Sequence, residues 1–276
     1  MLLALDVGNT NTVLALYNLD KESPGDIVAN WRVTTQKTQT ADEFGVLILS
    51  LLSLHKIDPG AVTGVIISSV VPPLDSTMRR VSERYFKIKP LFVEPGIKTG
   101  MPLLIDNPAE LGADRVANGV AAFARYGGPC VVVDFGTATS FDVVSANGEF
   151  LGGVIAPGLG ISADALFSRA AKLARVNIKR PVKAIGTSTV TNLQSGIFWG
   201  YIGLVDGILA RVIDELGGQA KVIATGGLAN LIADDSKYIT SVDHLLTLDG
   251  LRIIYQRNHA AKSASPRGRR AKGRID

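Results

Sequence analysis

The sequence has very little cysteine, and this scarcity excludes several classes of protein. Only one of the 276 residues is a cysteine, Cys130, so neither an intrachain disulfide nor a zinc site built from several thiolates can form. Cys130 lies in an apolar run, PCVVVD, where we expect a buried and unreactive thiol. A single thiol is compatible with a reducing compartment, and we expect a cytoplasmic protein.

The sequence also lacks a targeting segment and a long uncharged apolar run. We identify residues 44–54 as the longest such run, and this run is too short to cross a bilayer, which takes about 20 residues. The chain begins MLLALD, in which no basic residue precedes the apolar stretch and Asp6 interrupts it. We therefore expect neither a secretory signal nor contact with a membrane.

The excess of positive charge lies in the C-terminal segment. The formal net charge is +4, but residues 257–276 alone carry +6, which leaves −2 for the rest of the chain. The ASPRGRRAKGR stretch lacks large apolar side chains, so residues 257–276 are predicted to be a disordered tail. We favour a solvated tail over a nucleic-acid contact, because no aromatic residue is interleaved with the charges.

Hydrophobic periodicity predicts an α/β protein. The expected strands cover residues 2–7, 12–18, 28–33, 64–71, 90–93, 131–134 and 221–225, with a second hairpin meander between 131 and about 157. The expected helices cover residues 40–54, 74–86, 112–126, 160–173, 189–215 and 245–257. Thr40 with Glu43 three residues later predicts a capping box at the start of the first helix.

An internal repeat relates the two halves of the chain. LALDVGNTNT begins at residue 3 and VVVDFGTATS begins at residue 131, so that Asp6 and Asp134, like Gly8 and Gly136, are offset by 128 positions. Each motif places an aspartate at the end of an apolar strand and follows it with glycine and with hydroxyl or amide side chains. Such a repeat predicts two similarly folded halves that face a cleft.

The residue types of the repeat suit phosphate chemistry. Glycine lets backbone N–H groups approach an anion, Thr and Asn add donors, and an aspartate holds Mg²⁺ directly or through water. Phosphoryl transfer requires mainly positioning and charge neutralisation. The sequence has no G-x-x-x-x-G-K-[ST] string and no G-x-G-x-x-G string, which argues against a Walker-type site and a dinucleotide fold.

The segment DNPAELGADRVAN, residues 106–118, places Asp114 and Arg115 near a helix start. The carboxylate there is suited to accept a hydroxyl proton, and the arginine is suited to pair with a substrate anion. A capping aspartate with a surface arginine is equally compatible with the spacing alone. Asp142 and Asp164 are further candidate acids that the sequence does not place.

The two repeat motifs, followed by VIATGG at 222–227, resemble the superfamily of actin, sugar kinases and heat-shock chaperone ATPases, in which two ribonuclease-H-like halves clamp ATP. The ordered strings DVGNTNT, NPAELGADRVAN, VVDFGTATSFD, GGVIAPG and GTSTVTNLQSGIFWG resemble type III pantothenate kinase from residue 3 to about residue 256. The resemblance implies two actin-like halves with mixed sheets flanked by helices, which we place at residues 1–118 and 119–256.

The resemblance also implies a reaction. Members of the family transfer the γ-phosphate of ATP to the hydroxyl of pantothenate, giving 4′-phosphopantothenate in the first step of coenzyme A synthesis. They use Mg²⁺ and a monovalent cation, K⁺ or NH₄⁺, and they are homodimers in which the partner helps to close the substrate pocket. Two alternatives stay open: a non-catalytic regulatory relative of the same fold, and a kinase of another small acceptor.

Residue roles follow from the resemblance by motif position. Asp114 matches the proton acceptor, Asp134 the monovalent-cation ligand, and Asp6 a contact to Mg²⁺ through water. The matched phosphate contacts are Asp6, Val7, Gly8, Asn9, Thr10, Asn11, Thr12, Val13 and Thr137. The matched substrate positions are Gly112, Ala113, Asp114, Arg115, Thr189 and Ile105, and the adenosine-side turn is Gly226-Gly227. Many members carry Tyr where this chain has Ile105, which leaves that contact in question.

Overall fold

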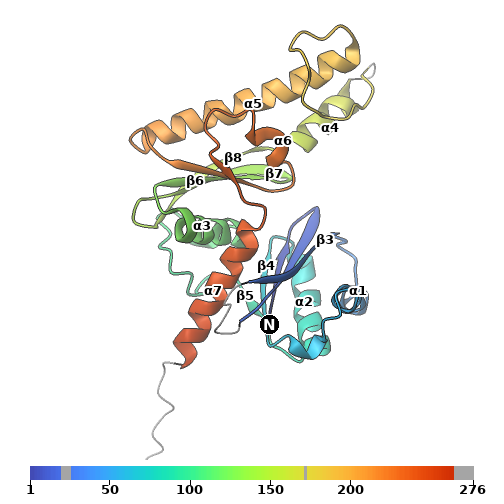
Figure 1. The fold of residues 1–276 in the computed structure, drawn as a ribbon, viewed down its shortest axis with the longest axis vertical. Helices are drawn as coiled ribbons and strands as arrows, with labels where there is room; N and C mark the ends of the chain where they lie inside the picture. Colours follow the sequence, from blue (N-terminus) through green and yellow to red (C-terminus); the bar gives the residue numbers. More distant parts are fainter. Residues whose placement is uncertain (20–25, 171–172, 264–276) are drawn as a thin grey trace, which may run out of the picture.

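The computed structural model describes residues 1–19, 26–170 and 173–263, and in this part of the chain it contains two five-stranded sheets (Figure 1). The first sheet has the order β3-β2-β1-β4-β5 and the second the order β8-β7-β6-β9-β10. In each sheet the central strand pairs antiparallel with the next strand along the chain and parallel with the strand that follows the three-stranded meander. The identical topology confirms the duplication and the mixed-sheet α/β fold that the sequence predicts.

The strands lie close to their predicted positions. Those of the first sheet are β1 (Leu2–Val7), β2 (Asn11–Tyr17), β3 (Ile27–Thr34), β4 (Gly64–Ser69) and β5 (Leu91–Phe92). Those of the second are β6 (Cys130–Phe135), β7 (Ala138–Val144), β8 (Phe150–Pro157), β9 (Lys221–Thr225) and β10 (Ser241–Val242). The two-residue strand β10 has too short an apolar pattern to be recognised, and the sequence analysis missed it.

The helices surround and separate the sheets. They are α1 (Ala41–Leu54), α2 (Pro72–Val81), α3 (Ala113–Tyr126), α4 (Leu159–Arg169), α5 (Thr189–Glu215), α6 (Ala229–Ala233) and α7 (Leu246–Ser263). The Thr40 side chain accepts from the Glu43 backbone N–H while Glu43 accepts from the Thr40 backbone, which confirms the capping box. Helix α2 starts at Pro72 rather than at 74, because proline is favoured at the first helical position.

Helices α3 and α7 form a layer shared by both sheets (Figure 1). The central core joins apolar residues of β1, β2 and β4 with those of β6 and β9, and α3 and α7 lie among them. The opposite face of the first sheet packs against α1 and α2, and the opposite face of the second against α5 and α6. Alternate residues of each central strand therefore point either into the shared layer or away from it.

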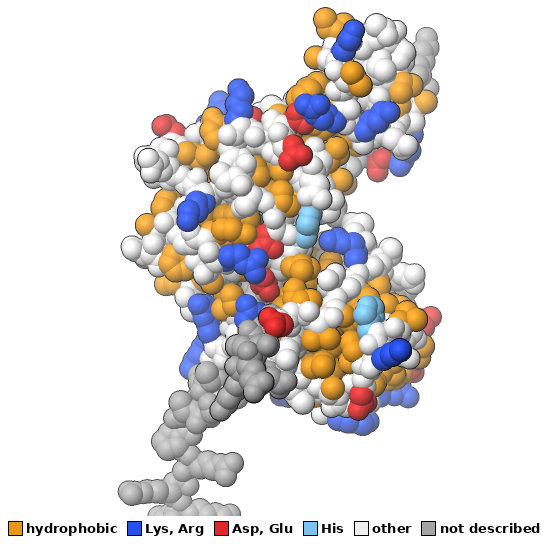
Figure 2. Space-filling view, in the orientation of Figure 1, with side chains coloured by type: hydrophobic (Ala, Val, Ile, Leu, Met, Phe, Trp, Pro, Cys, Tyr) orange, Lys and Arg blue, Asp and Glu red, His pale blue; other side chains and the backbone are white. Residues whose placement is uncertain are grey.

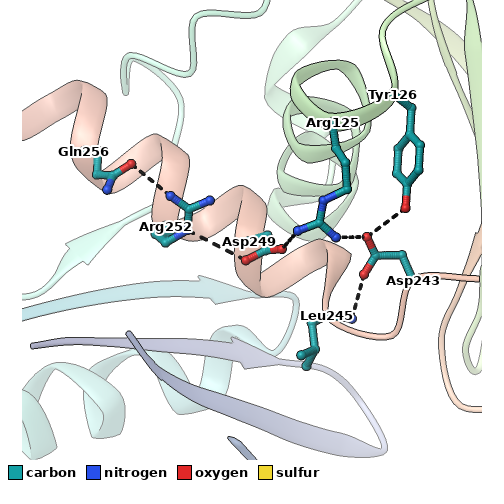
Figure 3. A network of polar contacts seen from close by, with 7 residues as sticks. All are labelled: Arg125, Tyr126, Asp243, Leu245, Asp249, Arg252 and Gln256. Atoms are coloured by element: carbon teal, nitrogen blue, oxygen red, sulfur yellow. Dashed lines mark hydrogen bonds and ion pairs between the residues drawn. The ribbon is translucent and has the colours of Figure 1, made fainter. Parts of the chain in front are cut away.

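A polar cluster fastens α3 to α7 (Figure 3). The Arg125 guanidinium, on α3, donates to Asp249 on α7 and to Asp243 in the segment before α7. Asp243 also accepts from the Tyr126 hydroxyl at 3.2 Å, and Arg252 lies 3.7 Å from Asp249. Both carboxylate side chains are 7% exposed, whereas Arg125 is 47% exposed. The half-exposed Arg125 guanidinium thus pairs with two buried carboxylates.

Two terminal features differ from expectation. Helix α7 continues to Ser263 instead of ending at 257, so residues 257–263 are helical and not part of a disordered tail. Asn258 explains the extension, because its amide donates to the carbonyls of Lys98 and Ile254. The predicted tail beyond residue 263 lies outside the described residues. The predicted division of the chain at 118/119 falls inside α3 and stays a prediction.

The apolar run 44–54 is not the strongest candidate for a membrane span. Helix α5 is long and apolar enough to cross a membrane by length and composition, and 28% of its most apolar window is buried. Such a helix is weak evidence for a membrane, because the core helix of a soluble protein passes the same test. Its inner face packs on the second sheet through residues such as Phe198, Val205 and Leu209.

We expect Arg125→Gln to destabilise the fold by about 2–4 kcal/mol, because it leaves the buried Asp243 without its cation and Asp249 with only the more distant Arg252; the exposure of Arg125 puts the value below the usual range for a buried pair. Urea unfolding followed by circular dichroism measures the change. The control is Arg84→Gln, which breaks an exposed ion pair with Asp42 and should cost less than about 1 kcal/mol. Equal losses of unfolding free energy in the two variants would contradict a stabilising role of the polar cluster around Arg125.

Candidate functional site

The repeated aspartates occupy equivalent places in the two sheets. Asp6 is on β1 and Asp134 on β6, each one residue from the strand end. Leu2 and Ala4 on β1, and Cys130 and Val132 on β6, belong to the shared core, so the alternation turns both carboxylates toward the shared layer. The strand pairing therefore brings the two acids to the space between the sheets, as the repeat predicts.

The two loops that follow these acids meet. The hydroxyls of Thr10 and Thr137 lie 2.7 Å apart and form a hydrogen bond between the halves. Asn9, Thr10 and Thr137 are exposed at the loop tips. By contrast Val7 and Thr12 are fully buried, and the Thr12 hydroxyl bonds to that of Thr35 at 2.9 Å. Within the predicted phosphate segment, the loop tip is thus available to a ligand and its flanks are structural.

A third acid reaches the same space from the shared layer. Asp114 lies in the first turn of α3. Burial, together with the charges of Asp114 and Asp134, raises the pKa of Asp6 to about 8. Burial and the charge of Asp114 likewise raise the pKa of Asp134 to about 6, and burial raises that of Asp114. Three carboxylates from three separate segments are therefore close enough to repel one another.

Two glycines lie close to these acids. Gly226 has φ +90°, and a Cβ there would lie 2.6 Å from Asp134 Oδ1 and 2.7 Å from the Phe135 backbone. A Cβ at Gly112 would lie 2.5 Å from Asp114 Oδ1. The turn after β9 thus requires glycine at 226, whereas a side chain at 112 would force the Asp114 carboxyl group to move.

Arg115 is held by an acid that the sequence did not place. Its Nε donates to Asp142 Oδ1 at 2.5 Å, and Asp142 is fully buried while the Arg115 side chain is 19% exposed. The guanidinium also lies 5.6 Å from the centre of the Phe150 ring. Asp142 faces the shared layer because it is paired with Val132 on β6. The alternative interpretation, in which Arg115 is a surface side chain, is therefore wrong.

Asn118 links Asp134 to helix α7. Its Nδ2 donates to Asp134 Oδ2 at 3.2 Å, and its Oδ1 accepts from the Thr247 hydroxyl on α7 at 2.7 Å. Asn118 is fully buried and lies one helical turn after Asp114. Sequence analysis quoted this residue within its motif but assigned it no role, since the contact depends on how α3 and α7 pack.

The remaining predicted substrate positions lie in two places. Ile105 lies beside β8, because a Cβ built at Gly152 would be 3.9 Å from Ile105 Cγ2. Arg115 lies beside the next residue of β8, because a Cβ built at Gly153 would be 2.9 Å from Arg115 Nη2. Thr189 starts α5, on the face of the second sheet opposite α3 (Figure 1). It lines a groove with Leu166, Asn192, Leu193 and Ile197. The fold of one chain thus brings Ile105, but not Thr189, toward Arg115.

The donor set fits a cation shared with a ligand better than a metal site complete in itself. Within the described residues, no group of three or more His, Cys, Asp or Glu side chains is close enough to hold a metal ion together. Mg²⁺ commonly uses one or two carboxylates and takes its other ligands from water and substrate phosphates. Asp6 and Asp134 supply one carboxylate each, on opposite sides of the space between the sheets.

Comparison with solved structures agrees with this architecture. A Campylobacter jejuni chain described as a Baf family transcriptional activator matches with a TM-score of 0.58 at 22% identity, covering 94% of this chain and 99% of that one. The activator of the 2-hydroxyisocaproyl-CoA dehydratase from Clostridium difficile, with bound ADPNP, matches with a TM-score of 0.55 at 13% identity, covering 96% and 98%. At these identities the likeness concerns the fold alone, and it agrees with two mixed sheets flanked by helices.

Comparison with protein sequences identifies the family. The model of the type III pantothenate kinase family matches residues 2–211. The type III pantothenate kinase of Koribacter versatilis strain Ellin345 is 62% identical over 265 residues, covering 94% of this chain and 97% of the relative. The match therefore includes both acid-bearing loops, the start of α3 and most of α5. The chain belongs to the type III pantothenate kinase family.

Proposed function

We propose that the space between the two sheets is where this chain transfers the γ-phosphate of ATP to the hydroxyl of pantothenate. The observation that carries the proposal is the meeting of Asp6, Asp114 and Asp134 beside the hydroxyls of Thr10 and Thr137. Acids and donors from both halves are what a phosphoryl transfer site needs for positioning and charge neutralisation. Membership of the family supports the choice of acceptor.

Asp114 is the proposed proton acceptor. Burial raises its pKa, and a carboxylate with a raised pKa accepts a hydroxyl proton more readily than an ordinary one. The backbone N–H of Arg115 donates to its Oδ1 at 2.8 Å, which fixes the orientation of the carboxyl group. The proton leaves the pantothenate hydroxyl as its oxygen bonds to phosphorus, and the bond between phosphorus and the leaving oxygen of ADP breaks.

The other roles follow from position. Arg115 holds the carboxylate of pantothenate, and Asp142 keeps the guanidinium turned toward it. The loop tip with Asn9 and Thr10, together with Thr137, contacts the phosphates, and Gly226-Gly227 borders the adenosine. Mg²⁺, held near Asp6, and K⁺ or NH₄⁺, held by Asp134, supply charge neutralisation when bound.

A second copy of the chain is the proposed partner. Hydrophobic side chains are exposed on the lobe formed by α4 and the start of α5 (Figure 2), including Leu166, Val182, Ile185 and Val190. Thr189 lies on this lobe and away from Arg115 of its own chain. A homodimer covers the apolar surface and brings Thr189 of one chain toward the cleft of the other. This placement of α5 favours a cytoplasmic dimer over a membrane-bound chain.

We expect Asp114→Asn to lower turnover about 10²–10⁴-fold while ATP binding is retained, because the amide does not accept the hydroxyl proton. ADP release is measured with Mg-ATP and a panel of pantothenate, sugars, acetate and buffer, in K⁺ and in Na⁺. The matched control is Asp42→Asn, an exposed acid on α1 paired with Arg84, which should behave as wild type.

The panel also tests the alternatives. ATP hydrolysis that does not depend on pantothenate would overturn the choice of acceptor. Absence of turnover with every acceptor, together with salt-sensitive DNA binding, would favour the regulatory relative. Turnover that is equal in K⁺ and Na⁺ would contradict the cation role of Asp134.

The dimer is tested by co-expressing two variants, Asp114→Asn and Thr189→Ala, each of which is expected to be inactive on its own. Co-expression allows dimers to form that contain one chain of each variant. If Thr189 acts across the interface, each mixed dimer has one intact site, so random pairing restores about a quarter of wild-type turnover. No recovery in a sample shown by light scattering to contain dimers would place Thr189 in its own chain's site or outside the site.

We expect Asp6→Asn to stabilise the ligand-free protein at high pH. A pKa raised from 3.8 to about 8 means that the folded state prefers the protonated acid, so the stability contribution of Asp6 is full below the unfolded value and lost as the pH rises to about 8. The melting temperature of the variant should therefore exceed that of wild type at about pH 9, and the gap should narrow by about pH 5. A gap that widens on acidification would contradict the crowding of the three acids.

A further inference from the structure

Strand β3 carries an arginine in the same row as Asp6. Arg32 is paired with Val13 on β2, and Val13 is paired with Asp6 on β1. Residues directly opposite in paired strands place their side chains on the same face of a sheet. The neighbours Trp31 and Val33 pack into the outer core with α1 and α2. Arg32 therefore points to the other face, where Asp6 lies.

The Arg32 guanidinium reaches the second half of the molecule. A Cβ at Gly227 would lie 4.0 Å from Arg32 Nη1. Burial raises the pKa of both Asp6 and Asp134, and the charge of Arg32 opposes the rise in both. One side chain of the first sheet is thus near an acid of each half and near the glycine turn after β9.

The guanidinium keeps its donors available. Among the hydrogen bonds and ion pairs of residues 1–19, 26–170 and 173–263, none involves Arg32, whereas Arg115, Arg125 and Arg180 are each held by carboxylates. The Arg32 residue is exposed, so its guanidinium is open to solvent and to a ligand. An arginine that is directed at acids, without being paired to one, has its planar fork of donors free for another anion.

The duplication shows that the repeated aspartate does not by itself require this arginine. In the second sheet Asp134 is paired with Ser140, and Ser140 with Ile155. Ile155 therefore occupies the position equivalent to Arg32, and it is 63% exposed. If the arginine served only to neutralise the aspartate of its row, the equivalent row would need a cation as well. Only the row of Asp6 has one.

We infer that Arg32 binds the phosphate chain of the nucleotide, as a contact from β3 that adds to those of the two loops. The inference rests on the proposal that ATP occupies the space between the sheets. A guanidinium forms two parallel hydrogen bonds with phosphate oxygens, which lysine does not reproduce. Its place beside both acids also lets it offset their repulsion of the triphosphate.

The test compares Arg32→Gln and Arg32→Lys in the full-length protein. Calorimetric titration with Mg-ATP, without pantothenate, gives the dissociation constant, and steady-state kinetics give KM for each substrate. We expect Arg32→Gln to weaken ATP binding at least ~10-fold. The dissociation constant of Arg32→Lys for ATP should lie between those of Arg32→Gln and wild type. In both variants KM for pantothenate should stay within about twofold of the wild-type value. Arg84→Gln is the matched control and should leave ATP binding unchanged.

The outcomes separate this inference from the proposed function. Unchanged ATP affinity in folded Arg32→Gln, or an equal loss of affinity for ATP and pantothenate, would overturn the phosphate contact. If the wild type bound ATP through Arg32 but did not phosphorylate pantothenate, the inference would stand and the proposed acceptor would fall. If Arg32→Gln does not fold, the Lys variant decides: it keeps the charge, so ATP binding equal to wild type would show that the planar fork is not used.

Discussion

The burial of two apolar sheet faces against a single helical layer is the constraint on which this structure depends. Each sheet needs cover on both faces, and α3 and α7 provide the inner cover for both at once. The central strands therefore end side by side, and their inward-facing alternation carries an aspartate from each sheet to the same space. The site exists because one core is shared, and not because the halves possess special loops.

The shared layer also brings acids together at an energetic cost. Burial raises the pKa of Asp6, Asp114 and Asp134, and the charge of Asp114 adds to the rise at the other two. In the proposed function, cations and the donors of the loops offset this repulsion when the substrates are bound. The charge of Arg32 lowers the pKa of both repeated aspartates, Asp6 and Asp134. Such stored repulsion is typical of sites that are tuned for charged ligands.

The sequence was most informative where a motif and a periodic pattern coincided. The repeat at Asp6 and Asp134 predicted two similar halves, because strand alternation and turn glycines are local signals. The role of Asp142 was out of reach, since its partner Arg115 is 27 positions away and comes from another layer. Arg32 was missed for a related reason: only the pairing of three strands places it beside Asp6. Residues joined by packing leave no local pattern to read.

Helix α3 has a mechanical consequence. Its first turn carries Asp114, its middle carries Asn118, and its last turn carries Arg125, which is fastened to α7. Eleven residues of α-helix span about 16 Å, so the proposed base and the polar cluster around Arg125 lie at opposite ends of the same helix. The contacts that fasten α3 to α7 at Arg125 and at Asn118 therefore also fix where the proposed base lies relative to the last helix.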